Sequence, residues 1–262
     1  MTSNQYETKL LEVLSGDQFQ TLRAVKGKPL LLKIEERFNK SLQTLCEHGS
    51  ISQAFYQSTR ATGSQSARLY GLAKLHKDNV PLCPVLSLPG SCYHKLNKIL
   101  SRFFDKVPGA NIETCTPAKK DLLASSTIDE DETVFSLDVK SLYTNVPVQE
   151  AIIHAVECLY SSECVPEFEK DVFIQLMKLA VTEVHFMACG QWFLQKDGVA
   201  MGSSLAVFPA NLWPKKFEEK IRLEVTRPPS TVESNICKVC LELVTWEGSS
   251  VFCDGCCTWC HA

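Results

Sequence analysis

A short apolar segment that carries a single carboxylate constrains the fold of this chain more than any other feature. Residues 134–139 read Val-Phe-Ser-Leu-Asp-Val, a run typical of a β-strand in which Asp138 is the one ionisable side chain. An aromatic residue, Tyr143, follows five positions later, and a turn is expected at residues 145–147. By itself, a carboxylate in this position is more often a turn residue than a metal ligand, so its meaning depends on the segments around it.

The composition is that of a soluble globular protein. Hydrophobic residues make up 45% and charged residues 22% of the 262 positions, and no apolar run reaches the length of about 18 residues expected of a membrane span. Residues 1–7 have neither the basic region nor the apolar region of a secretory signal. We therefore expect an intracellular protein, nuclear or cytoplasmic, with no membrane partner. Its thirteen cysteines are then reduced thiols or metal ligands.

Charge is distributed unevenly along the sequence. Up to Ala110 the chain has 15 Lys and Arg against 8 Asp and Glu, whereas the remainder has 12 against 22. A basic first half would attract a phosphate backbone. The alternative is a solvated surface whose charge happens to be uneven.

Apolar spacing and turn residues predict an alternation of helices and strands. We expect helices at residues 6–25 (broken at 15–17), 29–46, 93–107, 116–125, 148–161 and 166–181. Strands are expected at residues 68–77, 84–88, 184–188 and 191–195, and the last two form a hairpin across Cys189–Gly190. The fold class is therefore α+β.

Two segments carry residues suited to phosphate. No acidic residue lies between Glu47 and Asp78, and the intervening residues include the cations Arg60, Arg68, Lys74 and Lys77. This segment is either a phosphate-contacting surface or an exposed basic hairpin. The glycine-bracketed residues 198–202 run into an apolar helix that Ser203 or Ser204 would cap, an arrangement that suits phosphate but is also common in ordinary turns.

Six blocks, taken together and in this order, resemble the reverse transcriptase domain of Penelope-like and related retroelements. The blocks are residues 60–64, 69–77, 81–87, 135–147, 195–203 and 210–212. The resemblance covers residues 6–220 and implies a partial right-hand polymerase, with a fingers-like region at 1–130 and an incomplete palm at 131–224. A linker at 225–235 then leads to a cysteine-rich tail at 236–262.

The resemblance also implies roles for single residues. Asp138 would be the catalytic aspartate that binds Mg2+, and Tyr143 would close over the sugar and exclude ribonucleotides. Lys74 or Lys77 would lie near the incoming triphosphate. Gln195, Gly198 and Gly202 would line the nucleotide and the template. The implied partner is an RNA or DNA template–primer, and the implied activity is RNA-directed DNA polymerisation.

Departures from the family pattern argue against that activity in the chain as written. Cys83 stands where the family has an arginine that contacts the triphosphate, and Ala73 and Ser204 stand where it has proline. The aspartate-pair motif and the thumb have no counterpart in these residues, and two-metal catalysis needs more carboxylates than Asp138 supplies. We therefore expect an inactive relative. The alternatives are a non-catalytic nucleic-acid or chromatin-binding protein and a product with no selected role.

The tail has the spacing of zinc ligands. Two Cys-x-x-Cys pairs are followed by a further Cys and a His, giving the candidate ligands Cys237, Cys240, Cys253, Cys256, Cys260 and His261. This pattern resembles the first half of a PHD finger, a family in which many members bind histone tails. Neither zinc site of that family would be complete within residues 236–261, so a single improvised Zn2+ site or a set of surplus thiols remains open.

Overall fold

The structure is a computed structural model that describes residues 2–22, 29–75, 79–108, 110, 142–163, 165–225, 244–247, 250–253 and 258–261, with side chains to residue 216. The chain divides into two compact units. One comprises Met1–Asn111 and Tyr143–Trp213, and the other Ile112–Leu142 and Pro214–Ala262. The predicted strand around Asp138 and the predicted helix at 116–125 lie outside the described residues.

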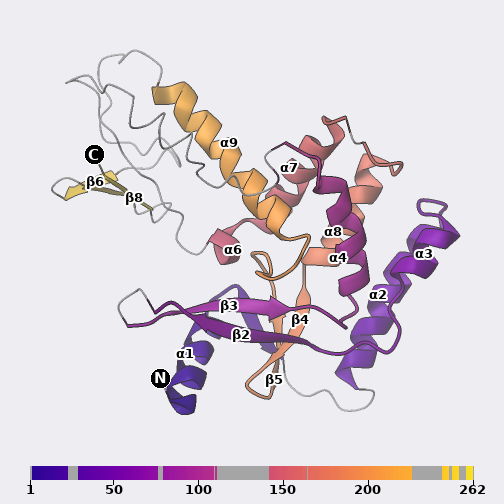
Figure 1. The fold of residues 1–262 in the computed structure, drawn as a ribbon, viewed down its shortest axis with the longest axis horizontal. Helices are drawn as coiled ribbons and strands as arrows, with labels where there is room; N and C mark the ends of the chain where they lie inside the picture. The colour runs from indigo at the N-terminus through magenta and orange to yellow at the C-terminus, as the bar shows by residue number, and fades with distance from the viewer. Residues whose placement is uncertain are drawn as a thin grey trace. The chain divides into compact units, whose positions relative to one another are not determined.

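The first unit is built on a five-stranded mixed sheet with the order β1-β5-β4-β2-β3 (Figure 1). Its strands are β1 (Phe19–Leu22), β2 (Ala67–Ala73), β3 (Leu82–Ser87), β4 (Val184–Ala188) and β5 (Gln191–Gln195). The pair β2–β4 is parallel, whereas β1–β5, β4–β5 and β2–β3 are antiparallel. Strands from the predicted fingers and palm regions thus share one sheet, and the predicted α+β class is confirmed.

Eight helices are described. They are α1 (Ser3–Leu14), α2 (Leu30–Glu47), α3 (Gln53–Thr59), α4 (His94–Phe104), α6 (Leu142–Asn145), α7 (Val148–Tyr160), α8 (Lys170–Val181) and α9 (Val207–Val225). In Figure 1, α4, α7 and α8 lie together above the sheet, whereas α1 lies beside β2 and β3 below it. The fully buried rings of Phe104 and Phe173 lie 6.1 Å apart, and Phe104 stacks on Phe208 of α9 at 5.1 Å.

One buried amide ties this helical layer to the start of α9. Asn97 of α4 is 1% exposed, and its Nδ2 donates to the carbonyl oxygens of Tyr93 and Ala180. Its Oδ1 accepts from the hydroxyl of Ser203 at 2.5 Å. Ser203 in turn accepts from the backbone N–H groups of Leu205 and Ala206, which lie in the turn just before α9. The predicted capping of α9 itself by Ser203 or Ser204 stays a prediction.

Local signals predicted several elements correctly. Pro29 precedes the first residue of α2, and Gly49 follows its end with φ of +72°. The β4–β5 hairpin turns at Cys189 and Gly190, whose φ values of +46° and +74° are those of a type I′ turn. Helix α8 begins at Lys170 and not at residue 166. Phe168, in the segment before it, contacts Phe55 with ring centroids 4.9 Å apart.

The prediction of helix throughout residues 6–25 is wrong after the break. Helix α1 ends at Leu14, and β1 then forms an edge strand in which Phe19 faces Gln195 and Leu22 faces Trp192 of β5. Phe19 is buried with its ring edge-on to Phe186 at 5.9 Å. Pairing with a strand far along the chain overrides the local helical spacing.

The second unit contains a three-stranded antiparallel sheet with the order β6-β7-β8. Its strands are β6 (Val244–Glu247), β7 (Ser250–Cys253) and β8 (Thr258–His261). Among the described residues of the whole chain, no helix combines the length and the apolar character needed to cross a membrane. The predicted domain boundaries at residues 130, 224 and 235 stay predictions.

Candidate functional site

The described residues include only some of the predicted site. Asp138, Lys77, Cys237, Cys240 and Cys256 lie outside them. Cys253 ends β7, and Cys260 and His261 end β8, where only the backbone is described. Lys74, Tyr143, Gln195, Gly198 and Gly202 belong to the first unit, and their surroundings define a candidate site.

The glycine loop, residues 195–203, starts where β5 ends. Gln195 is 4% exposed, and its Nε2 donates to the carbonyl oxygen of Asp197 at 3.2 Å. Asp197 Oδ1 accepts from Gly198 N at 2.8 Å and from Val148 N at 3.3 Å. Gln195 is therefore a buried support of the loop, and Asp197 connects the loop to the first turn of α7.

Gly198 brings the loop against α6. Its φ is +72°, and a Cβ atom added there would lie 2.6 Å from the Thr144 carbonyl oxygen and 2.8 Å from that of Tyr143. The next residue, Val199, donates its N–H to the Tyr143 carbonyl at 2.6 Å. Only glycine fits this contact, because both the backbone angle and the space exclude a side chain.

Gly202 makes a second close approach, to β3. Its φ is +102°, and an added Cβ atom would lie 2.6 Å from the Leu86 carbonyl oxygen and 3.1 Å from Val85 Cγ1. Leu86 donates its N–H to the carbonyl of Met201 at 2.7 Å. The glycine loop thus hydrogen-bonds to the edge strand of the sheet.

Tyr143, Cys83 and Met201 meet where these contacts converge. Cys83 Sγ lies 3.3 Å from Met201 Sδ. Burial, together with the nearby Cys83 thiol, raises the pKa of Tyr143. The half-buried Tyr143 hydroxyl therefore stays protonated at neutral pH and is available as a hydrogen-bond donor.

Strand β2 has an exposed surface next to Cys83, and we call this surface the β2–β3 face. Alternation along β2 puts Arg68, Tyr70 and Leu72 on one side, and register adds Cys83, which faces Leu72. Lys74 follows the last residue of β2 and donates its N–H to the Pro81 carbonyl at 3.0 Å, at the end of this face. Tyr70 is 44% exposed and Leu72 55% exposed. The face therefore combines two cations with an aromatic ring and an aliphatic side chain at the surface.

The sequence pattern indicated an aromatic residue, Tyr70, within the basic segment, but it assigned no role to Leu72 or Met201. For Leu72, the available signal was its spacing of two residues from Tyr70, because alternate strand residues share a side. Met201 is recognised only through its contact with Cys83, which no local pattern encodes.

The described side chains do not fit a catalytic metal centre. They include no group of three or more His, Cys, Asp or Glu residues placed to hold an ion. Asp197, the carboxylate of the glycine loop, uses its Oδ1 for two backbone N–H groups. The Mg2+ and Zn2+ sites expected at Asp138 and at the tail cysteines stay predictions.

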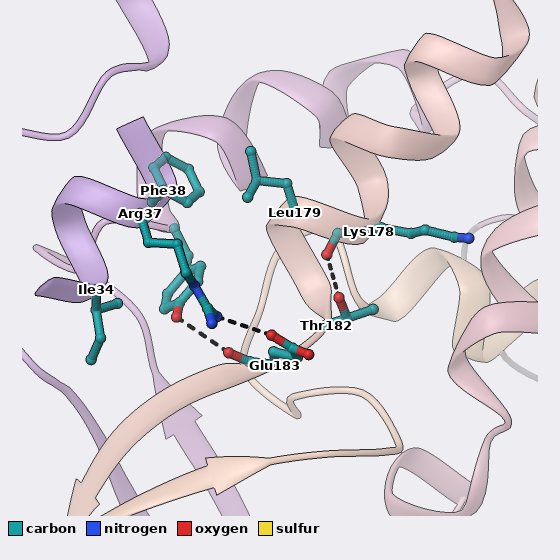
Figure 2. A pocket seen from close by; sticks show the side chains of 8 residues that line it. Ile34, Arg37, Phe38, Lys178, Leu179, Thr182 and Glu183 are labelled. Atoms are coloured by element: carbon teal, nitrogen blue, oxygen red, sulfur yellow. Dashed lines mark hydrogen bonds and ion pairs between the residues drawn. The ribbon is translucent and has the colours of Figure 1, made fainter. Parts of the chain in front are cut away.

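A small cavity of about 70 Å³ lies elsewhere in the unit, between α2 and α8 (Figure 2). Arg37 and Glu183 form an ion pair across it at 2.9 Å, but both side chains are more than half exposed, so the pair contributes little stability. Beside it, Tyr93 Oη donates to the Glu183 carbonyl and lies 3.1 Å from His185 Nδ1. These contacts hold the start of β4 in place and give His185 a structural role.

Comparisons with known proteins identify no relative. No protein-family model matches the chain, and neither a curated protein nor a solved structure shows a significant match to it.

Proposed function

We propose that this chain is a retroelement-derived, reverse transcriptase-like protein that binds a template–primer without extending it. One observation carries the proposal. The glycine loop, α6 and β3 are far apart in sequence, yet Gly198 and Gly202 bring them into direct backbone contact. These segments belong to three of the blocks on which the sequence resemblance rests.

The chemistry of the β2–β3 face supports binding to nucleic acid. Arg68 and Lys74 are suited to phosphate oxygens, and Tyr70 presents a ring on which a base can stack. Tyr143, with its protonated hydroxyl, lies near Cys83 at one end of this face. A surface of this kind binds strands with little sequence preference and with marked sensitivity to salt.

The same residues argue against efficient polymerisation. Cys83 cannot supply the two-pronged cationic contact that an arginine offers a triphosphate. Two magnesium ions, when bound, would activate and stabilise the oxygens of phosphoryl transfer. The resemblance assigns a single carboxylate of this chain, Asp138, to these ions. Asp197 already accepts hydrogen bonds from the backbone N–H groups of Val148 and Gly198 with its Oδ1.

Primer extension tests this part of the proposal. The purified chain is incubated with template–primer, deoxynucleotides and Mg2+, and no extended product is expected. Magnesium-dependent extension that disappears in Asp138→Ala would overturn it.

The second candidate is a non-catalytic chromatin-binding protein that uses its cysteine-rich tail. The observation in its favour is the β7–β8 pairing, in which Cys253 faces Thr258 and Cys260 faces Val251, so that two candidate zinc ligands lie on adjacent strands. Metal analysis of the purified chain tests it. About one zinc per chain, lost in Cys253→Ser, favours this candidate, whereas a zinc-free chain with intact template–primer binding counts against it.

A further inference from the structure

Helix α4, in the helical layer above the sheet (Figure 1), carries a row of exposed cations. Lys95, Lys98 and Arg102 are all exposed, and their spacings of three and four residues put them on one side of the helix. At a rise of about 1.5 Å per residue they span about 10 Å of its axis. The buried Leu96 and Leu100 lie on the opposite side. We call the three cations the α4 stripe.

Acidic residues do not balance the α4 stripe. Between Glu47 and Asp105 the sequence has seven Lys and Arg against one acidic residue, Asp78. Residues 94–104 contain no Asp or Glu, whereas every other described helix with Lys or Arg also contains an acidic residue. The stripe forms no ion pair with another described residue. Its three charges are therefore available to an external anion.

The two helices that pack on α4, α3 and α8, add no net negative charge. Helix α3 contains no charged residue and ends at its C-cap, Arg60, which is exposed. Lys95 Nζ donates to the carbonyl oxygen of Arg60 at 3.2 Å, so a further basic residue lies beside the start of the stripe. Helix α8 has one acidic residue, Asp171, against Lys170 and Lys178.

The stability of α4 does not explain the stripe. Arg102 lies in the last turn, where the helix dipole favours a cation. Lys95 and Lys98 lie in the first half of the helix, where the dipole does not favour one. Like charges three or four residues apart also repel each other and destabilise a helix. A polyanion bound along the stripe would remove this repulsion.

The side chains of the stripe fit the outside of a nucleic-acid duplex. Lys and Arg bind phosphate oxygens and position a protein on a duplex without reading its sequence. Surfaces for single strands combine cations with aromatic rings on which bases stack, as Tyr70 offers on the β2–β3 face. The exposed positions of α4 carry no aromatic residue. A duplex needs none, because its bases are already stacked inside and its phosphates lie outside.

We infer that the α4 stripe binds the phosphate backbone of a nucleic-acid duplex, such as the double-stranded part of a template–primer. The inference rests on the proposed function for the nature of the partner, nucleic acid. It adds a contact that lies outside the β2–β3 face and the glycine loop, and it assigns that contact to the paired part of the ligand.

Fluorescence anisotropy on the whole chain tests the inference with two labelled probes of equal length, a blunt duplex and a single-stranded oligonucleotide. The double variant Lys98→Gln/Arg102→Gln removes two phosphate contacts. Its affinity for the duplex should fall about tenfold, and the slope of log K against log salt concentration should become shallower by about two. Its affinity for the single strand should stay within about twofold of the wild type.

Lys33→Gln/Lys40→Gln is the matched control. It removes two cations from α2, a helix that also carries acidic residues, and should bind both probes like the wild type. Thermal unfolding guards against a folding defect, because Lys98→Gln/Arg102→Gln replaces two charges that repel each other and should unfold close to the wild-type temperature. Lys95→Gln, at the other end of the stripe, provides a second measurement and should reduce the salt slope for the duplex by about one.

The outcomes separate this inference from the proposed function. If Lys98→Gln/Arg102→Gln binds the duplex like the wild type while Lys74→Ala weakens template–primer binding, the inference fails and the proposed function stands. An equal loss for duplex and single strand overturns the assignment to a duplex. Polyglutamate that displaces the duplex as effectively as unlabelled duplex does would make an acidic protein the partner and overturn it too. A wild type that binds neither probe refutes the proposed function together with the inference.

Discussion

Gly198 and Gly202 show how much a single residue determines in this fold. Each combines a positive φ with a backbone carbonyl 2.6 Å from the position of a Cβ atom. The resemblance predicted both glycines as site residues, but their partners, the carbonyls of Thr144 and Leu86, follow only from the three-dimensional structure. No local pattern reveals which distant backbone a glycine must approach.

We predict that Gly198→Ala destabilises the first unit far more than Gly63→Ala. Gly63 also has a positive φ, +64°, but nothing lies within 4 Å of its Cβ position, so its substitution costs only backbone strain of about 1–2 kcal/mol. Gly198→Ala adds a clash with backbone atoms and should cost about 2–5 kcal/mol in total. Urea unfolding of both variants measures the difference, and equal costs would refute the close contact.

His185 gives the stability a dependence on pH. Burial, and then the positive charge of Arg37, lower its pKa from the usual value of 6.5. The folded state therefore binds this proton less readily than the unfolded state, so the stabilisation is complete above pH 6.5 and is lost as the pH falls through the lowered pKa. The carboxylate of Glu183 opposes the shift without reversing it.

We accordingly expect the free energy of unfolding of the wild type to fall between about pH 7 and about pH 5 more steeply than that of His185→Gln. Gln has no titrating group but keeps a polar group next to Tyr93 Oη, which lies 3.1 Å from His185 Nδ1. Urea midpoints measured across this range provide the comparison. Parallel pH profiles for the two proteins would contradict the assignment.

At the scale of elements, sequence reasoning succeeded where the signal was local. Pro29 marked the start of α2, and Cys189–Gly190 marked the β4–β5 turn. It failed at β1, because the four residues of this strand are stabilised by pairing with β5 and not by their own periodicity. The candidate site was predicted only in part for the same reason. The sequence indicated the loop glycines, but it did not indicate which distant strand or helix they contact.

Strand β1 offers a direct test of that explanation. Phe19→Ala should destabilise the protein by about 3–5 kcal/mol, because a buried ring that contacts Phe186 is lost. Gln20→Ala changes the exposed neighbour in the same strand and should stay within about 0.5 kcal/mol of the wild type. If the two substitutions cost the same, β1 does not contribute a buried strand to the sheet.

For the whole chain, the proposed function predicts that template–primer binding depends on the positive charges of the β2–β3 face. Lys74→Ala should weaken template–primer binding and reduce its dependence on salt, because one phosphate contact is lost. Lys40→Ala removes the same charge from an exposed position of α2 and should bind like the wild type. Fluorescence anisotropy at several salt concentrations measures both, and equal losses would mean that binding follows overall charge alone.

We propose that the β2–β3 face and the glycine loop together form the nucleic-acid surface of this protein. Hydrogen exchange of the whole chain, with and without bound template–primer, tests this proposal. Slower exchange is expected in β2, β3, α6 and residues 195–203, with no change around Lys40 in α2. Protection that spares β2, β3 and the glycine loop while template–primer is bound would rule out this surface.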